Sequence, residues 1–176
     1  MELGLIHIYC GDGKGKTTAA MGLGMRAAGR DKNVLLTQFL KDNETGELNS
    51  IEKLGANFEV FKGIPVKKFL KFMSPEEQMA TRKEHEERFG KVTKKAIDEN
   101  IDLLILDEII AATNLELVPL NKVITFLENK PEGLEVVLTG RNPNEKLIEL
   151  ADYVSEIKAV KHPYEKGIKS RIGIEK

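Results

Sequence analysis

The chain alternates between short apolar runs and longer stretches in which apolar and polar residues are mixed. Runs of strand length include Leu5–Tyr9, Asn33–Leu40, Ile101–Leu106 and Leu134–Leu138. Short strands that alternate with longer helices are typical of an α/β fold, with a mostly parallel central sheet and helices on both faces. Because the Ile101–Leu106 run is almost purely apolar, we expect a central strand that is buried on both sides.

The strongest helix signals lie at the start of two of the longer stretches. One helix is predicted from Lys16 to Ala28, ended by Gly29. Another is predicted from Ser74 to about residue 100, with Ser74 as N-cap, Pro75 at the first helical position and Glu77 closing a capping box. The other expected elements are helices over 46–54, 120–129 and 144–150, and strands over 57–61 and 153–160.

The segment from Gly63 to Met73 alternates basic and apolar residues and has no clear period. It is either a loop that folds over a ligand or a plain connector. The helix after it carries the charge run RKEHEER, which predicts a solvent-exposed face that includes His85. The expected packing stripe of this helix consists of Met79, Phe89, Val92 and Ala96.

Composition narrows the possible classes of protein. A length of 176 residues with 41% hydrophobic residues predicts one domain, residues 1–176. The 27 Lys and Arg residues nearly balance the 28 Asp and Glu residues, so we expect no nucleic-acid partner, and any polyanion site must be local. One cysteine excludes an intramolecular disulfide framework. No apolar run approaches the roughly 20 residues of a membrane span, so we expect a cytoplasmic protein without a membrane partner.

The clearest chemical motif is CGDGKGKTT at residues 10–18, between the first strand and the first helix. This is the context of a P-loop, in which backbone N–H groups and a helix N-terminus bind phosphate. Lys16 is expected to place its ammonium on the phosphates, and Thr17 to offer its hydroxyl to Mg²⁺. The nucleotide-binding residues are predicted to be Gly11, Asp12, Gly13, Lys14, Gly15, Lys16, Thr17 and Thr18.

The loop departs from the pattern G-x-x-x-x-G-K-[ST] at Cys10, where the pattern has glycine. The glycines at 11, 13 and 15 still suit a tight turn, with a changed phosphate register. We expect Cys10 to be a small buried residue, and a thiol with a lowered pKa beside the loop is the alternative. A glycine-rich turn without a ligand is the other interpretation of the whole segment.

Two further polar groups follow expected strands. Asp107 and Glu108 end the central strand, where open α/β sheets bind ligands; one is predicted to hold Mg²⁺ and the other to orient a nucleophile or ribose hydroxyls. The alternative is that Asp107 caps the next helix. Arg141 is either a phosphate ligand or a solvated loop residue, and Gln38 and Lys41 are candidate ligand contacts.

Taken in this order, the motifs resemble those of the ATP:corrinoid adenosyltransferase family, the cob(I)yrinic acid a,c-diamide adenosyltransferases. The matching stretches are YCGDGKGKTTAAMGLGMRAAG at 9–29, QFLK at 38–41, GE at 46–47, LILDE at 104–108, VVLTGR at 136–141, LADYVSE at 150–156 and KHPYEKGIKSRIGIE at 161–175. The likeness covers most of the chain apart from roughly 62–100.

The resemblance implies a RecA-like P-loop fold, often dimeric, and transfer of the 5′-deoxyadenosyl group of ATP to a Co(I) corrinoid, with triphosphate as leaving group. ATP and a corrinoid are then the substrates, Mg²⁺ the cofactor and an electron donor the source of Co(I). Lys16, Glu108 and Arg141 become the candidate catalytic residues. Because Co(I) is itself the nucleophile, Glu108 is better read as a metal or ribose partner than as a base. His162 either lines the site or is structural.

One stretch departs from the family. Between roughly 62 and 73 the family often has an aromatic GFTW-like sequence on the corrinoid side, whereas this chain has no tryptophan, and Phe69 and Phe72 are the nearest aromatics. They either contact a corrin face or pack in the core, and we favour the core. The competing functions are a P-loop kinase or NTPase, in which Glu108 serves a water or an acceptor hydroxyl, and a non-catalytic ATP- or corrinoid-binding protein.

Overall fold

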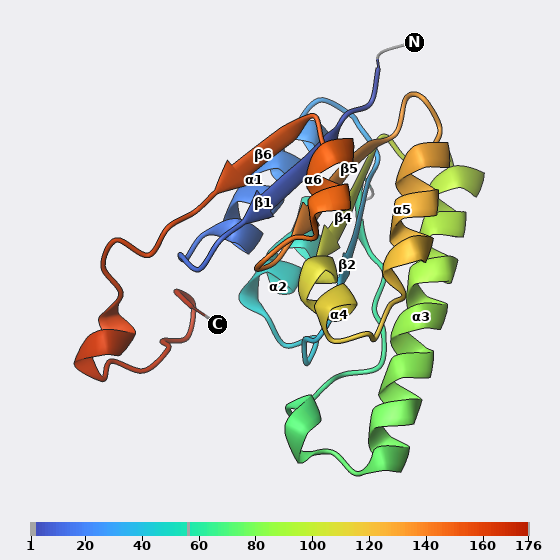
Figure 1. Cartoon of the computed structure of the whole chain (residues 1–176). Helices are drawn as coiled ribbons and strands as arrows, with labels where there is room; N and C mark the ends of the chain where they lie inside the picture. Colours follow the sequence, from blue (N-terminus) through green and yellow to red (C-terminus); the bar gives the residue numbers. More distant parts are fainter. Residues whose placement is uncertain (1–2, 56, 176) are drawn as a thin grey trace.

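Strands and helices alternate along the chain in the computed structural model, which describes residues 3–55 and 57–175 (Figure 1). Within that part, six strands form one sheet in the order β3-β2-β4-β5-β1-β6, and every neighbouring pair is parallel. The strands are β1 (Ile6–Cys10), β2 (Val34–Gln38), β3 (Phe58–Val60), β4 (Leu103–Asp107), β5 (Glu135–Thr139) and β6 (Tyr153–Glu156). Residues 1, 2, 56 and 176 of the predicted domain lie outside the described residues.

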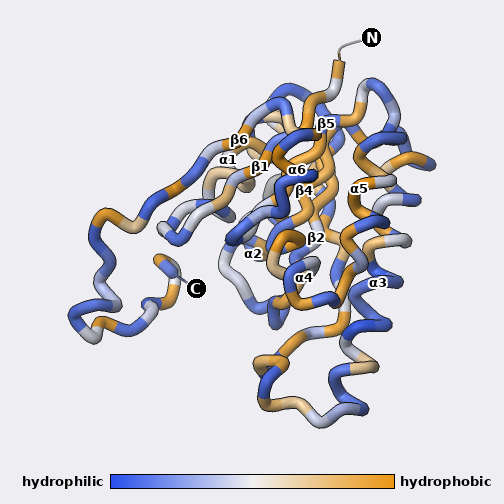
Figure 2. Tube along the Cα trace, in the orientation of Figure 1, coloured by the Kyte–Doolittle hydropathy of each residue, from blue (hydrophilic) through white to orange (hydrophobic). Residues whose placement is uncertain are grey.

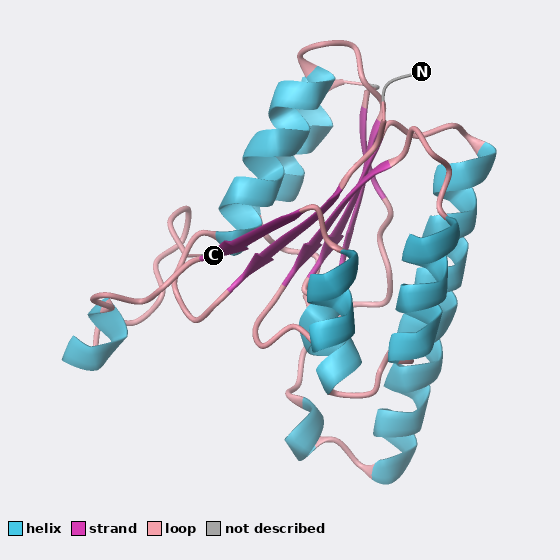
Figure 3. Cartoon of the chain, turned by 45° about the horizontal axis from the view of Figure 1, so that its top comes forward, coloured by secondary structure: helices cyan, strands magenta, loops and turns pink. Residues whose placement is uncertain are grey.

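Helices cover both faces of this sheet (Figure 3). One face carries α1 (Lys16–Ala28) and α2 (Gly46–Leu54), and the other carries α3 (Pro75–Asp98), α4 (Ile109–Asn114), α5 (Leu120–Asn129) and α6 (Glu145–Leu150). Two 3₁₀ turns, η1 (Leu70–Phe72) and η2 (Pro163–Lys166), complete the described elements. The predicted α/β class with a RecA-like P-loop architecture is confirmed, with β5 between the P-loop strand and β4. None of the helices in the described part is long and apolar enough to cross a membrane.

The core has two layers, one on each face of the sheet. In β4, Leu104 and Leu106 pack into the layer under α3 to α6, while Leu103 and Ile105 pack into the layer under α1 and α2. Each fully buried leucine or isoleucine contributes about 1.5–3 kcal/mol. The almost purely apolar sequence of this strand is therefore explained by its central position, between β2 and β5. Figure 2 shows the apolar strands inside and the hydrophilic outer sides of the helices.

The expected helix boundaries hold where local signals fix them. The bounds of α1 agree with the prediction, and α3 begins with the predicted capping box. Ser74 Oγ accepts from the N–H of Glu77, and the Glu77 carboxylate accepts from the N–H of Ser74. The two edge strands are shorter than expected: β3 covers only Phe58–Val60, and β6 ends at Glu156.

Two expectations for α3 are wrong. Met79 is 68% exposed, because the N-terminal half of the helix projects beyond the sheet (Figure 1). His85, expected in solvent, is fully buried. Its Nδ1–H is shared between the carbonyl of Thr81 and Glu84 Oε2, each 2.9 Å from Nδ1. Its Nε2 accepts from the N–H of Leu40 (3.3 Å), so the ring has partners that offset its burial. The expected burial of Phe89, Val92 and Ala96 is confirmed.

The Gly63–Met73 segment is largely irregular, with η1 near its end. Phe69 is 76% exposed and Phe72 is 67% exposed, so the interpretation of these rings as core residues is wrong. The rings meet edge to face with centroids 6.5 Å apart, and Lys71 Nζ lies 4.8 Å from the centre of the Phe72 ring. The segment therefore presents an aromatic and basic surface to solvent.

Beside His85, α3 holds a buried ion pair. Arg88 Nε lies 2.8 Å from Glu84 Oε1, and Arg88 Nη2 lies 2.6 Å from Glu84 Oε2. Burial opposes ionisation of Glu84, but hydrogen bonds from His85 and Arg88 outweigh it and lower the pKa of Glu84 to about 2. Both residues belong to the charge run RKEHEER, which the sequence predicts to be exposed to solvent.

Because the pKa of Glu84 falls from 4.5 to about 2 on folding, the ionised carboxylate stabilises the protein above pH 4.5, and this contribution is lost as the pH falls toward 2. Glu84→Gln is expected to lower the free energy of unfolding at neutral pH by on the order of 3 kcal/mol and to flatten its decline on the acid side. Urea unfolding at a series of pH values measures both effects. Glu87→Gln, on an exposed position of α3, is the control, and equal acid-side slopes for the two variants would contradict the assignment.

Candidate functional site

The loop from β1 to α1 lies at the edge of the sheet where the carboxyl ends of the parallel strands meet (Figure 1). Its backbone passes close to the chain that follows β6. Gly11 has φ 105°, and a Cβ there would lie 2.3 Å from the carbonyl oxygen of Ile157. Gly13 N–H donates to that oxygen (2.8 Å), and Ile157 N–H donates to the carbonyl of Cys10 (2.8 Å). Only glycine fits at position 11, which explains one of the small residues in the motif.

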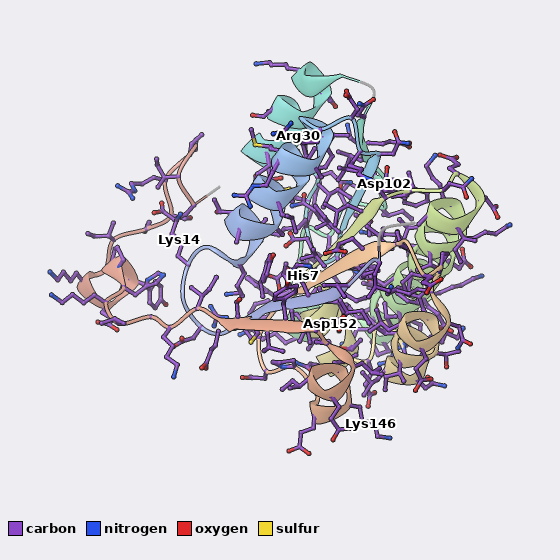
Figure 4. All side chains as sticks on the ribbon, turned by 90° about the horizontal axis from the view of Figure 1, so that it is seen from above. His7, Lys14, Arg30, Asp102, Lys146 and Asp152 are labelled. Carbon is purple, nitrogen blue, oxygen red and sulfur yellow. The ribbon has the colours of Figure 1, made fainter. Side chains whose placement is uncertain are left out.

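Two flanking side chains of the loop serve its structure. Asp12 accepts from the N–H of Ala159 (3.0 Å), and this hydrogen bond lowers the pKa of Asp12. Cys10 is buried as expected, and burial raises the pKa of its thiol, so the alternative of a lowered thiol pKa is wrong. Lys14 is exposed and projects from the loop (Figure 4).

Lys16 is the buried cation of the loop. Its Nζ donates to the carbonyl of Gly13 (2.9 Å), three residues earlier. Burial and then the charge of Arg141 lower the pKa of Lys16, while Glu108, Asp12 and Asp107 oppose this effect. A phosphate oxygen is a stronger acceptor for this ammonium than a carbonyl that is already part of the loop.

Asp107 joins three elements at the end of β4. The side chain is fully buried. Its Oδ1 accepts from the hydroxyls of Thr17 (2.9 Å) and Thr139 (2.7 Å), and its Oδ2 accepts from the amide of Gln38 (3.1 Å). The structure thus brings together the predicted residues Thr17, Asp107 and Gln38. Thr139 belongs to the same cluster, although its place in the TGR motif was the only sequence signal for it.

Glu108 follows in the left-handed region, with φ 59°. Its N–H donates to Thr139 Oγ1 (2.8 Å), and α4 begins directly after it without a side-chain cap, so the alternative that Asp107 caps this helix is wrong. Burial and then Asp107 raise the pKa of Glu108, while Lys41, Lys16 and Arg141 act in the opposite direction. Arg141 is exposed and Lys41 is half-buried, and both charges reach this carboxylate.

Three predicted residues lie outside this cluster. His162 Nδ1 accepts from the N–H of Tyr164 (3.2 Å), which caps η2 in the C-terminal segment beyond β6 (Figure 1). Phe69 and Phe72 lie at η1, beside the projecting end of α3. The predicted roles of all three in ligand binding stay predictions.

An open cavity of about 570 Å³ lies beside the loop. Its lining comes from the loop, from the turn after β5 and from the chain after β6: Gly11, Asp12, Asn142, Glu156, Lys158, Ala159 and Val160. Within the described residues, no group of three or more His, Cys, Asp or Glu side chains is placed to hold a metal ion. A metal at Asp107 would therefore need phosphate or water oxygens as further ligands, as Mg²⁺ commonly has.

Comparison with known proteins identifies the family. The family model described as "ATP:corrinoid adenosyltransferase BtuR/CobO/CobP" matches residues 2–175. The chain belongs to this family. A corrinoid adenosyltransferase of Escherichia coli K12 is 35% identical over 176 residues, covering 99% of this chain and 86% of that protein. The corrinoid adenosyltransferase CobA of Salmonella typhimurium gives the same identity and coverage.

Among solved structures, the similarity is weaker. EssC (ATPases 2 and 3) of Geobacillus thermodenitrificans aligns with a TM-score of 0.47 at 16% identity over 98% of this chain and 36% of that chain. The Hef helicase domain of Pyrococcus furiosus aligns with a TM-score of 0.45 at 13% identity over 96% of this chain and 37% of that chain. This adenosyltransferase-family chain thus spans little more than a third of either solved chain.

Lys16→Ala is expected to weaken ATP binding roughly 10- to 100-fold, because a charge-assisted hydrogen bond to phosphate is lost. The fold should persist, because the ammonium of Lys16 donates to a carbonyl of the loop itself and its burial carries a desolvation cost. Calorimetric titration with ATP measures the affinity, and thermal unfolding checks the fold. Lys14→Ala, at an exposed position of the same loop, should have the smaller effect, and unchanged affinity in Lys16→Ala would contradict the placement of the nucleotide.

Proposed function

We propose that this protein transfers the 5′-deoxyadenosyl group of ATP to the cobalt of a Co(I) corrinoid and releases triphosphate. The family match over residues 2–175 is the observation that carries the proposal. The cluster of Lys16, Thr17 and Asp107 at one edge of the sheet supports it, because these residue types bind a nucleotide triphosphate.

The proposed step forms one bond and breaks one. The electron pair of Co(I) attacks C5′ of the ribose, the C5′–O5′ bond breaks, and its electrons leave with the triphosphate. Cobalt is the nucleophile, so the protein needs no base to activate it. Its task is to hold C5′ in line with the metal and to stabilise charge on the departing phosphates. The loop amides up to residue 18, apart from that of Gly13, which donates to Ile157, are suited to the second task, as are the N-terminus of α1, Lys16 and Arg141.

The residues at the end of β4 fit a Mg²⁺ ion. Asp107 offers carboxylate oxygens and Thr17 a hydroxyl, which are hard oxygen donors of the kind that Mg²⁺ prefers. Mg²⁺, when bound, would neutralise charge on the phosphates of ATP. Glu108 is proposed as a partner of the metal or of the ribose hydroxyls, and Gln38 and Lys41 as neighbours of the same ligand.

A P-loop NTPase is the second candidate, and Glu108 is the observation that favours it. A half-exposed carboxylate beside Asp107, with a raised pKa, is suited to orient a water molecule. The exposed rings of Phe69 and Phe72 favour the adenosyltransferase, because a flat apolar corrin face is a suitable contact for them. They lie in the segment where the chain departs from the family pattern.

The partners and the location belong to the proposal. We propose an electron donor that supplies Co(I), a homodimer and a cytoplasmic location. Support for a subunit contact comes from apolar side chains exposed on β6 and the C-terminal segment: Tyr153, Val154, Val160, Ile168 and Ile172. The β6 edge and this segment are continuous along the chain, so one partner surface can cover both.

Incubation of the protein with MgATP and a chemically reduced corrinoid is expected to yield adenosyl–cobalt and inorganic triphosphate in equal amounts. The visible spectrum follows the cobalt product, and ³¹P NMR distinguishes triphosphate from ADP and phosphate. ADP and phosphate would favour the NTPase. ATP binding without either product would favour a binding protein.

Asp107→Asn is expected to raise the Mg²⁺ concentration for half-maximal ATP binding by about 10-fold or more, because the neutral amide is a poorer ligand. Asp102→Asn, at the position directly before the start of β4 (Asp102 is labelled in Figure 4), is the control and should leave it unchanged. Titration of ATP binding with Mg²⁺ measures the effect. An equal Mg²⁺ requirement in both variants would remove Asp107 from the metal site.

A further inference from the structure

The buried guanidinium of Arg88 joins two loop segments that are distant in sequence. Its Nη1 donates to the carbonyl of Gln38 at the end of β2 (2.6 Å), and its Nη2 donates to the carbonyl of Ile64 (3.1 Å). The Glu84 carboxylate holds the other side of the guanidinium and accepts from the N–H of Ile64 (3.1 Å). The Arg88 side chain is only 2% exposed, so its hydrogen bonds are made without competition from water.

The turn that follows β2 adopts a conformation that these contacts support. Leu40 (φ 58°) and Asn43 (φ 63°) lie in the left-handed region, which non-glycine residues rarely adopt. His85 Nε2 accepts from the N–H of Leu40, and the side chain of Asn43 donates to the carbonyl of Gly63 (2.7 Å). Two residues of α3 and the 63–64 segment therefore hold a strained turn in place.

The same turn carries groups of the nucleotide site. The amide of Gln38 donates to Asp107 Oδ2 and accepts from Thr45 Oγ1 (3.1 Å), while its main-chain carbonyl is bound by Arg88. The charge of Lys41 reaches Glu108, and the carbonyl of Lys41 accepts from the N–H of Val66 (2.9 Å). Gln38 is thus contacted by Arg88 at its backbone and by Asp107 at its side chain.

We propose that Arg88, held by Glu84, is a positioning residue that fixes the turn at 38–43 so that Gln38 meets Asp107. The same guanidinium fixes the 63–66 segment, which leads to the exposed Phe69 and Phe72, to this turn. Arg88 thereby sets the position of the Gln38 amide, which binds the Asp107 carboxylate, relative to the segment that carries Phe69 and Phe72. The inference rests on the proposed function in one respect, the part that Asp107 plays in binding Mg²⁺ with ATP.

Gly63 offers a way to displace the guanidinium without changing α3 or the site. A Cβ at Gly63 would lie 2.0 Å from Arg88 Cζ, and the φ of Gly63 is outside the left-handed region, so the backbone accepts alanine. Gly63→Ala therefore moves the Arg88 side chain by steric contact. Gly90→Ala is the matched control, because its Cβ would meet no atom within 4 Å apart from its chain neighbours and the nearby backbone of α3.

The decisive measurement is the Mg²⁺ concentration for half-maximal ATP binding, read by calorimetry without any corrinoid. Gly63→Ala and Arg88→Met are expected to raise it about 10-fold, as is usual when a supporting partner of a metal ligand is lost, and Gly90→Ala to leave it unchanged. Arg88→Lys keeps the charge but not the forked donors, so it should recover only part of the loss. A requirement equal to wild type in Gly63→Ala, with a lowered thermal midpoint alone, would reduce Arg88 to a structural role and overturn the proposal.

A double-mutant cycle tests the route of the effect. If Arg88 acts through Gln38, then Gln38→Ala combined with Gly63→Ala should need no more Mg²⁺ than Gln38→Ala alone. If the increases in Mg²⁺ requirement of Gln38→Ala and Gly63→Ala add in the double variant, the proposal is overturned. It is also overturned if the wild type binds ATP independently of Mg²⁺. The Mg²⁺ measurement needs no corrinoid, so it is independent of the transfer reaction. If the wild type binds MgATP but releases no triphosphate when a reduced corrinoid is added, the proposed function is contradicted and the role of Arg88 stands.

Discussion

The site depends on one fully buried carboxylate, Asp107, whose oxygens need hydrogen-bond partners inside the protein. Removing such a group from water is costly unless its oxygens are well hydrogen bonded. Three donors meet this need, and they come from α1, β2 and β5 through Thr17, Gln38 and Thr139. The requirement of a single side chain therefore fixes how three elements meet at the edge of the sheet.

The two carboxylates at the end of β4 are accompanied by nearby cations. Asp107 and Glu108 are adjacent, and their mutual repulsion adds to burial in raising the pKa of Glu108. Lys16, Lys41 and Arg141 oppose that rise, so the edge carries cations that a polyphosphate can share. The nearly neutral net charge of the whole chain conceals this local arrangement. Lys16 donates to the neutral carbonyl of Gly13. An anionic phosphate oxygen is a stronger acceptor and can replace that carbonyl.

Local sequence signals were sufficient for some of these elements and not for others. The bounds of α1, the capping box of α3 and the buried strand β4 depend on residues within a few positions of each other, and the structure agrees with them. The burial of His85 could not be predicted in this way, because its partner Leu40 lies 45 residues away in the chain. The six-residue α4 follows a left-handed Glu108 and carries no capping signal. Phe69 has an apolar side chain of the kind usually found in a core, and it is exposed because its segment lies beyond the sheet.

Gln38 belongs both to the buried polar cluster around Asp107 and to the one around Arg88, and these contacts determine the course of the loop after β2. Apolar packing holds the sheet together but is non-directional, so it does not determine where a loop carbonyl must point. Arg88 supplies that direction at Gln38 O, and Asp107 supplies it at the amide of the same residue. A guanidinium in a fixed plane, matched by Glu84, restricts the turn more tightly than an apolar contact of the same size. The cost of burying these charges is thus offset by the geometry that they impose on the residues around the phosphate-binding loop.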